Sequence, residues 1–74
     1  MIHLYDRIVL SQDLPEKGLK RGDVGTIVMV YNEGEGYEVE FYTLDGSTYR
    51  VETLPSSYIR PVKKNEVTHV RETA

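Results

Sequence analysis

Hydrophobic and polar residues alternate in short stretches along this chain, and the pattern predicts five β-strands. The clearest covers residues 37–42, where Tyr37, Val39 and Phe41 occupy one face and other side chains lie between them. The remaining predicted strands are rich in β-branched or aromatic residues and cover residues 7–10, 24–31, 48–53 and 59–62. No helical period of useful length is present, so the pattern predicts an all-β chain.

The second predicted strand, residues 24–31, is apolar on both of its faces. Its side chains divide into two sets: Val24, Val28 and Val30 on one face, and Ile27, Met29 and Tyr31 on the other. A strand with one side in solvent alternates between apolar and polar residues. We therefore expect its second face to be covered by the long loop, by the tail or by a partner.

In the fourth predicted strand the alternation places Tyr49 and Val51 inside and the polar residues outside. Arg50 is then expected opposite Glu38 or Glu40 across the hairpin. A cross-strand ion pair of this kind contributes about 0.2–1 kcal/mol.

Turn-forming residues separate the predicted strands. Asp45-Gly46 is among the strongest short signals for a hairpin, and residues 54–58 predict a single 3₁₀ turn. The long polar loop of residues 11–21 contains Leu14 and Leu19, which we expect to anchor it onto the sheet because apolar side chains avoid water.

The chain has 74 residues and no cysteine, so one small core without disulfides must stabilise it. We predict one small, partly open β-barrel over residues 1–62 and a polar tail over residues 63–74. No stretch approaches the roughly 20 apolar residues that cross a bilayer, and the first residues lack the pattern of a secretion signal. We expect a cytoplasmic protein with no membrane partner.

The net charge of −3 is unevenly distributed. Residues 32–53 carry six acidic residues against Arg50 alone, a net −5, whereas residues 54–74 carry four basic residues against two acidic ones, a net +2. Phosphate backbones are bound through clustered positive charge. Nucleic acid is therefore not the expected partner.

The residue types that could act in catalysis or bind a metal have no partner groups nearby in the sequence. His3 and His69 lie near opposite ends of the sequence, so neither is expected to activate a serine or to complete a metal site. Glu38 and Glu40 share a strand face, but alternating glutamates on an exposed strand are typical of solvation and edge protection. The sequence predicts no enzymatic activity, no cofactor and no metal.

Three segments resemble, in order, motifs of the Src-homology-3-like (SH3-like) barrel. They are Leu4-Tyr5-Asp6, Lys20-Arg21-Gly22-Asp23 and Pro55-Ser56-Ser57-Tyr58-Ile59. The resemblance implies the same five-stranded SH3-like barrel over roughly residues 4–62. Members that bind proline-rich peptides use a tryptophan in the groove, and this chain has no tryptophan, so we do not expect polyproline docking.

A longer run of residues is similar to a family of small, stand-alone bacterial domains of unknown function. The run comprises Tyr5–Leu10, Asp13–Glu16, Gly18–Lys20 and Gly22–Val28. Some members lie beside toxin-like genes, so the resemblance implies an inhibitory, immunity-type binding role. The turn from Gly22 to Val28 is also similar to the KOW motif, which implies the alternative of a nucleic-acid-binding or ribosome-associated domain.

Tyrosines and basic residues define the candidate surface. Tyr5 and Tyr58 match positions that line the peptide groove in the SH3 family, and Lys17, Lys20 and Arg21 form a basic cluster in the long loop. We expect these five residues to bind another protein, because exposed tyrosines give contact area at little entropic cost. The acidic strands of residues 37–53 are a second candidate. The chain is thus predicted to be a non-catalytic protein-binding module.

Overall fold

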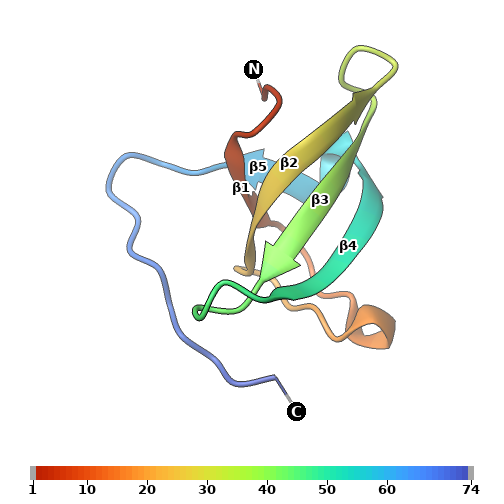
Figure 1. Ribbon diagram of the computed structural model, residues 1–74. Coiled ribbons are helices and arrows are strands. Elements are labelled where there is room, and N and C mark those ends of the chain that lie inside the picture. The colour runs from red at the N-terminus through yellow and green to blue at the C-terminus, as the bar shows by residue number, and fades with distance from the viewer. Residues whose placement is uncertain (1, 74) are drawn as a thin grey trace.

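Five antiparallel strands form one curled sheet in the order β4-β3-β2-β1-β5. The computed structural model describes residues 2–73 (Figure 1), and the strands are β1 (Arg7–Leu10), β2 (Val24–Tyr31), β3 (Gly36–Tyr42), β4 (Thr48–Pro55) and β5 (Ile59–Pro61). Within these residues β4 and β5 do not pair with each other, so the sheet is not closed into a barrel. The predicted all-β, partly open architecture is confirmed.

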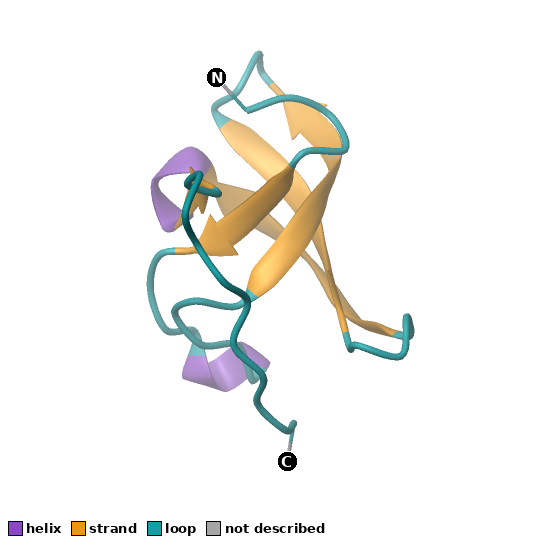
Figure 2. Cartoon of the chain, turned by 90° about the vertical axis from the view of Figure 1, so that its left-hand side faces the viewer, coloured by secondary structure: helices purple, strands orange, loops and turns teal. Residues whose placement is uncertain are grey.

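Two short 3₁₀ turns lie between the strands (Figure 2): η1 (Pro15–Lys17) in the long loop after β1, and η2 (Ser56–Tyr58) between β4 and β5. Leu14 and Leu19 form an isolated backbone bridge on either side of η1, and both side chains are buried. The loop therefore folds back through these two leucines, as predicted. The long loop, the two hairpins and the final 3₁₀ turn follow the order that the SH3-like resemblance implied.

The core lies on the inner face of the curled sheet. Its largest fully buried side chains are Ile8, Leu10, Leu19, Ile27 and Val39. Gly25 of β2 lies against β3 so closely that a Cβ there would be 2.5 Å from Val39 Cγ1 and 3.0 Å from the Glu40 carbonyl oxygen. Close packing of the interior therefore requires glycine at this position.

A β-bulge changes which side chains of β2 face the core. Ile27 pairs with Val39 and Met29 pairs with Glu38, so Val28 is an extra residue between the two pairs. Beyond it Met29 and Tyr31 are 48% and 38% exposed, whereas Val30 packs against the core. The predicted grouping of Ile27, Met29 and Tyr31 on one face is wrong, because the extra residue reverses the alternation.

A second bulge does the same to β4. Phe41 pairs with Arg50 and Tyr42 pairs with Thr48, so Tyr49 is the extra residue. Val51 is therefore 45% exposed on the outer face, and its predicted place inside is wrong. Arg50 lies opposite Phe41, and so the predicted pairing of Arg50 with Glu38 or Glu40 is also wrong.

Residues 62–73 contain no strand, and side-chain contacts tie them to the rest of the chain. Arg71 Nε lies 2.8 Å from Asp23 Oδ1, and its Nη2 lies 2.6 Å from Asp23 Oδ2 and 3.0 Å from the Gly18 carbonyl oxygen. Arg60 makes a similar two-point contact with Glu66, at 2.8 and 2.6 Å. We call the Arg71–Asp23–Gly18 contact the tail clamp.

The two ends of the described chain lie at opposite ends of the molecule (Figure 1). The N-terminal segment is near the β2–β3 hairpin, and the tail ends on the side of η1 and the β3–β4 hairpin. The contacts of the tail clamp account for the position of the C-terminal end, because they attach it to the loop that follows β1.

Candidate functional site

Tyr5 and Tyr58, the two predicted groove tyrosines, are held at opposite ends of β1. The Tyr5 backbone N–H donates to the Ile27 carbonyl at 2.7 Å, before β1 begins, and the Tyr5 residue is 72% exposed. The Tyr58 carbonyl accepts from the Ser11 N–H at 2.8 Å, after β1 ends, and the Tyr58 side chain is half-buried against the core. The structure therefore does not unite the two tyrosines in one groove beside β1.

The three predicted basic residues are divided between two places. Lys17 Nζ lies 3.4 Å from Glu52 Oε1, which joins η1 to β4. Lys20 and Arg21 are exposed, and their backbone N–H groups donate to Asp23 and Asp13 at 2.9 and 2.8 Å. That these residues bind a partner stays a prediction, although they do not form a single cluster with the tyrosines.

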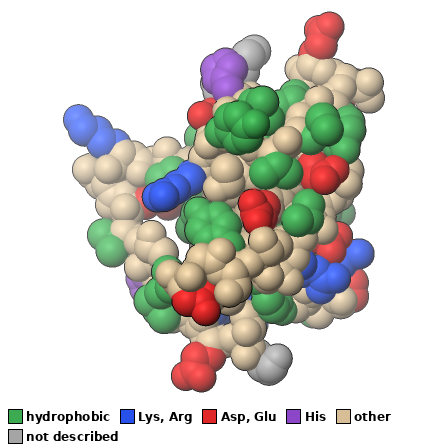
Figure 3. Space-filling model, in the orientation of Figure 1, with side chains coloured by type: hydrophobic (Ala, Val, Ile, Leu, Met, Phe, Trp, Pro, Cys, Tyr) green, Lys and Arg blue, Asp and Glu red, His purple; other side chains and the backbone are tan. Residues whose placement is uncertain are grey.

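A continuous surface of different residues lies on the side of β2, β3 and β4 that faces away from the core. Two rows of paired residues cross it: Thr26–Glu40–Val51 and Met29–Glu38–Thr53. Tyr31 lies two residues beyond Met29 on β2, on the same side of the sheet. We call the surface made by Met29, Tyr31, Glu38, Glu40 and Val51 the outer face. Figure 3 shows hydrophobic side chains interrupted by acidic ones over these strands.

Hydroxyl groups hold the two carboxylates of the outer face in place. Tyr31 Oη donates to Glu38 Oε1 at 2.7 Å, and Thr48 Oγ1 donates to Glu40 Oε2. The hydrogen bond to Glu38 raises the pKa of Tyr31, and desolvation and the negative charge of Glu38 act in the same direction. A hydroxyl carries no charge, so neither of these hydrogen bonds pairs the carboxylate with a cation.

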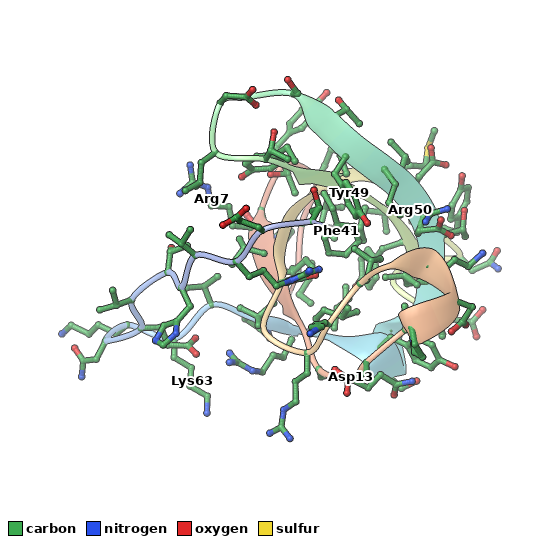
Figure 4. All side chains as sticks on the ribbon, turned by 90° about the horizontal axis from the view of Figure 1, so that it is seen from below. Arg7, Asp13, Phe41, Tyr49, Arg50 and Lys63 are labelled. Carbon is green, nitrogen blue, oxygen red and sulfur yellow. The ribbon has the colours of Figure 1, made fainter. Side chains whose placement is uncertain are left out.

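Acidic residues dominate the charge around the outer face. No lysine or arginine occurs from Gly22 to Tyr49, while this stretch contains Asp23, Glu33, Glu35, Glu38, Glu40 and Asp45. Arg50, the next residue, belongs to the inner side: its Nε lies 2.8 Å from Glu52 Oε2, beside the loop that carries η1 (Figure 4). Arg7, paired with Thr26, is at the margin of the outer face.

Sequence reasoning found part of this surface and missed the rest. The acidic strands of residues 37–53 were a predicted second candidate, and Glu38 and Glu40 belong to them. Met29, Tyr31 and Val51 were missed because the two bulges, which turn them outward, are not visible in the apolar pattern. The absence of any basic residue over residues 22–49 is the signal that could have indicated this face.

The glycine turn before β2, which resembles the KOW motif, is contacted by the C-terminal tail: Arg71 pairs with Asp23, the residue that follows Gly22. Gly22 has a φ of +97°, a conformation that glycine adopts readily. Burial raises the pKa of the adjacent Asp23 carboxyl, but hydrogen bonds from Arg71 and from the Lys20 N–H outweigh burial and leave that pKa lowered. A carboxylate fixed at this turn disfavours the approach of a phosphate.

Within residues 2–73 there is no group of three or more His, Asp or Glu side chains that could hold a metal ion. In the same part of the chain, no helix has the length and apolar character needed to cross a membrane. The cytoplasmic location and the lack of enzymatic activity stay predictions.

Comparison with known proteins gives a family. Residues 4–61 match the family described as "Domain of unknown function (DUF4926)". The chain belongs to that family. This confirms the resemblance to a family of small domains of unknown function. A search of the curated proteins and a search of the solved structures found no match.

Proposed function

We propose that this chain is a non-catalytic protein-binding module that docks through its outer face. The observation that supports this most directly is the exposure of Met29, Tyr31 and Val51, at 48%, 38% and 45%, beside two ordered carboxylates. Methionine and aromatic residues are enriched at protein interfaces. A group of them on one sheet face is therefore better explained by docking than by solvation.

The outer face is also ordered before a partner arrives. Its side chains come from three adjacent strands rather than from loops, and hydroxyl groups fix the carboxylates. Ordering side chains at an interface costs roughly 0.5–1.5 kcal/mol for each flexible one. A face that is already ordered avoids part of this cost, which favours binding.

An inhibitory role is the form of binding that we favour. It rests on the resemblance to small bacterial domains encoded beside toxin-like genes. A rigid face on a small sheet suits this role, because it can cover the working site of another protein without any chemistry of its own. A KOW-like interaction with nucleic acid is less favoured, since the acidic outer face repels phosphate.

Site-specific photocrosslinking tests the proposal. A benzophenone amino acid replaces Val51 on the outer face or, as a control, Gln12 in the exposed part of the long loop. With extract from the organism of origin, we expect the probe at position 51, and not at position 12, to capture one protein that mass spectrometry identifies. The captured protein is then purified and its affinity measured by calorimetry.

Two tyrosine variants complete the experiment. Tyr31→Ala is expected to abolish capture, and Tyr5→Ala, which removes a more exposed tyrosine, is expected to leave it intact. Circular dichroism confirms that both variants fold. Loss of capture in Tyr5→Ala alone would favour the surface predicted from the sequence, and equal capture from positions 51 and 12 would count against any specific docking face.

A further inference from the structure

Two sets of carboxylates in this protein differ in what holds them. Asp23, Glu52 and Glu66 are each paired with an arginine, at distances of 2.6 to 2.8 Å. Glu38 and Glu40 on the outer face are instead held by the hydroxyls of Tyr31 and Thr48. Their position is therefore fixed while their charge remains uncompensated by these partners.

The arrangement of the outer face is a stripe with two borders. Glu38 and Glu40 lie on β3, the middle one of the three strands that form the outer face. Met29 and Tyr31 border the stripe on β2, and Val51 borders it on β4. A surface that is complementary to this one carries positive charge in its middle and apolar groups on both sides.

We propose that the outer face binds an arginine-bearing, cationic surface of a partner protein. This inference rests on the proposed function and names the chemistry of the partner. Arginine fits better than lysine for two reasons. Its planar guanidinium can bond a fixed carboxylate through more than one N–H, and it can stack against the Tyr31 ring beside Glu38.

Charge distribution makes nucleic acid an unsuitable occupant of the same face. The β2–β3 turn adds Glu33 and Glu35 to the two glutamates of the stripe, residues 22–49 contain no cation, and Arg7 lies only at the margin of the face, where it pairs with Thr26. Complementary potentials raise the association rate and exclude partners of the wrong sign. The face thus selects a cationic partner and rejects a polyanion.

A peptide titration followed by NMR tests this inference without the natural partner. The ¹⁵N-labelled full chain is titrated with a peptide of alternating arginine and leucine, with a matched glutamate–leucine peptide, and with a single-stranded thymidine oligonucleotide. We expect only the arginine peptide to bind, with the largest amide shifts at Met29, Tyr31, Glu38 and Val51. Its affinity should fall at least about tenfold as the salt rises from about 50 to about 500 mM, because screening weakens exposed charge pairs.

A pair of double variants separates the outer face from net charge alone. E38Q/E40Q removes the stripe, and E16Q/E72Q removes two exposed carboxylates elsewhere, so the two variants have the same net charge. We expect a loss of about tenfold or more in peptide affinity for the first variant and little change for the second.

Four outcomes would overturn the inference: no binding of the arginine peptide, equal binding of the glutamate peptide or oligonucleotide, shifts centred on Lys20 and Arg21, or equal losses in both double variants. The proposed function fails separately. If crosslinking from position 51 identifies a partner while the arginine peptide does not bind, the docking face stands and its cationic partner does not.

Discussion

Arg50 Nε lies 2.8 Å from Glu52 Oε2, and the two residues are next-but-one neighbours on the inner side of β4. Glu52 also lies 3.4 Å from Lys17 Nζ, and the Arg50 guanidinium donates to the Lys17 carbonyl. The Glu52 side chain is only 14% exposed. One carboxylate thus joins the edge strand β4 to η1, where the sheet lacks a further strand.

Replacing Glu52 is expected to destabilise the fold. In Glu52→Gln the Arg50 and Lys17 side chains lose the carboxylate that they share, and removing one partner of such a half-buried ion pair should cost about 1–3 kcal/mol, between the values for exposed and for buried pairs. The free energy of unfolding, measured with urea, should fall by this amount. The control is Glu38→Gln on the outer face, where a change within about 0.5 kcal/mol is expected. Equal effects of the two substitutions would show that the Arg50–Glu52–Lys17 contact contributes nothing to stability.

Gly25→Ala is expected to strain the β2–β3 pairing. The added Cβ would lie 2.5 Å from Val39 Cγ1 and 3.0 Å from the Glu40 carbonyl oxygen. Overpacking of this kind costs about 1–3 kcal/mol, which thermal or urea unfolding measures. The matched control is Gly36→Ala in β3, where the nearest neighbour of a Cβ is the Leu54 carbonyl oxygen at 3.6 Å. A stable Gly25→Ala protein would mean that β2 and β3 can separate at no cost.

Arg71→Ala is expected to free the tail and leave the sheet intact. The variant loses the ion pair with Asp23 and the hydrogen bond to Gly18. Exposed ion pairs contribute about 0–1 kcal/mol, so global stability should change little. Heteronuclear NOE values of residues 67–73 should fall, while those of the strands stay constant. As a control, Arg21→Ala removes an exposed arginine outside the clamp and should leave these values unchanged.

Acid is expected to release the tail in a defined pH range. The pKa of Asp23 is lowered from 3.8, since the bonds from Arg71 and the Lys20 N–H outweigh burial, and the bond from Arg60 lowers the pKa of Glu66 from 4.5 to about 2. Groups with lowered pKa values stabilise the folded state above their unfolded values. That contribution is lost as the pH falls through the folded values.

The same NOE measurement follows this release. Values for the tail should be constant above about pH 5 and should fall as the pH drops from 4.5 towards 2. In Arg71→Ala the part that depends on Asp23 should be absent. Release of the tail only above neutral pH would contradict both pKa directions.

The positions of the strands could be predicted from the sequence, but the directions of many side chains could not. The alternation and turn signals give β1 and β2 with the observed bounds, Arg7–Leu10 and Val24–Tyr31. A bulge places one extra residue in a strand, and that residue need not be of any particular type. Val28 and Tyr49 are ordinary β-strand residues, so nothing in the pattern marks them as the extra ones.

The candidate site, too, could be predicted only in part. The resemblance to SH3-like barrels led to Tyr5 and Tyr58, because short motifs mark a fold more reliably than they mark a binding surface. The charge pattern led to the acidic strands, because the net charge of a segment is known from its composition. It does not depend on which side of the strand each side chain is assigned to. Met29 and Val51 required the structure itself.

The opposite placement of the chain ends decides how the protein should be attached in practice. A solid support or fluorescent label joined after the tail would sit on the side of η1, far from the β2–β3 hairpin (Figure 1). A support or label joined before β1 would lie near that hairpin, close to the part of the outer face that contains Tyr31. Capture experiments on this family member are therefore best anchored from the C-terminal side.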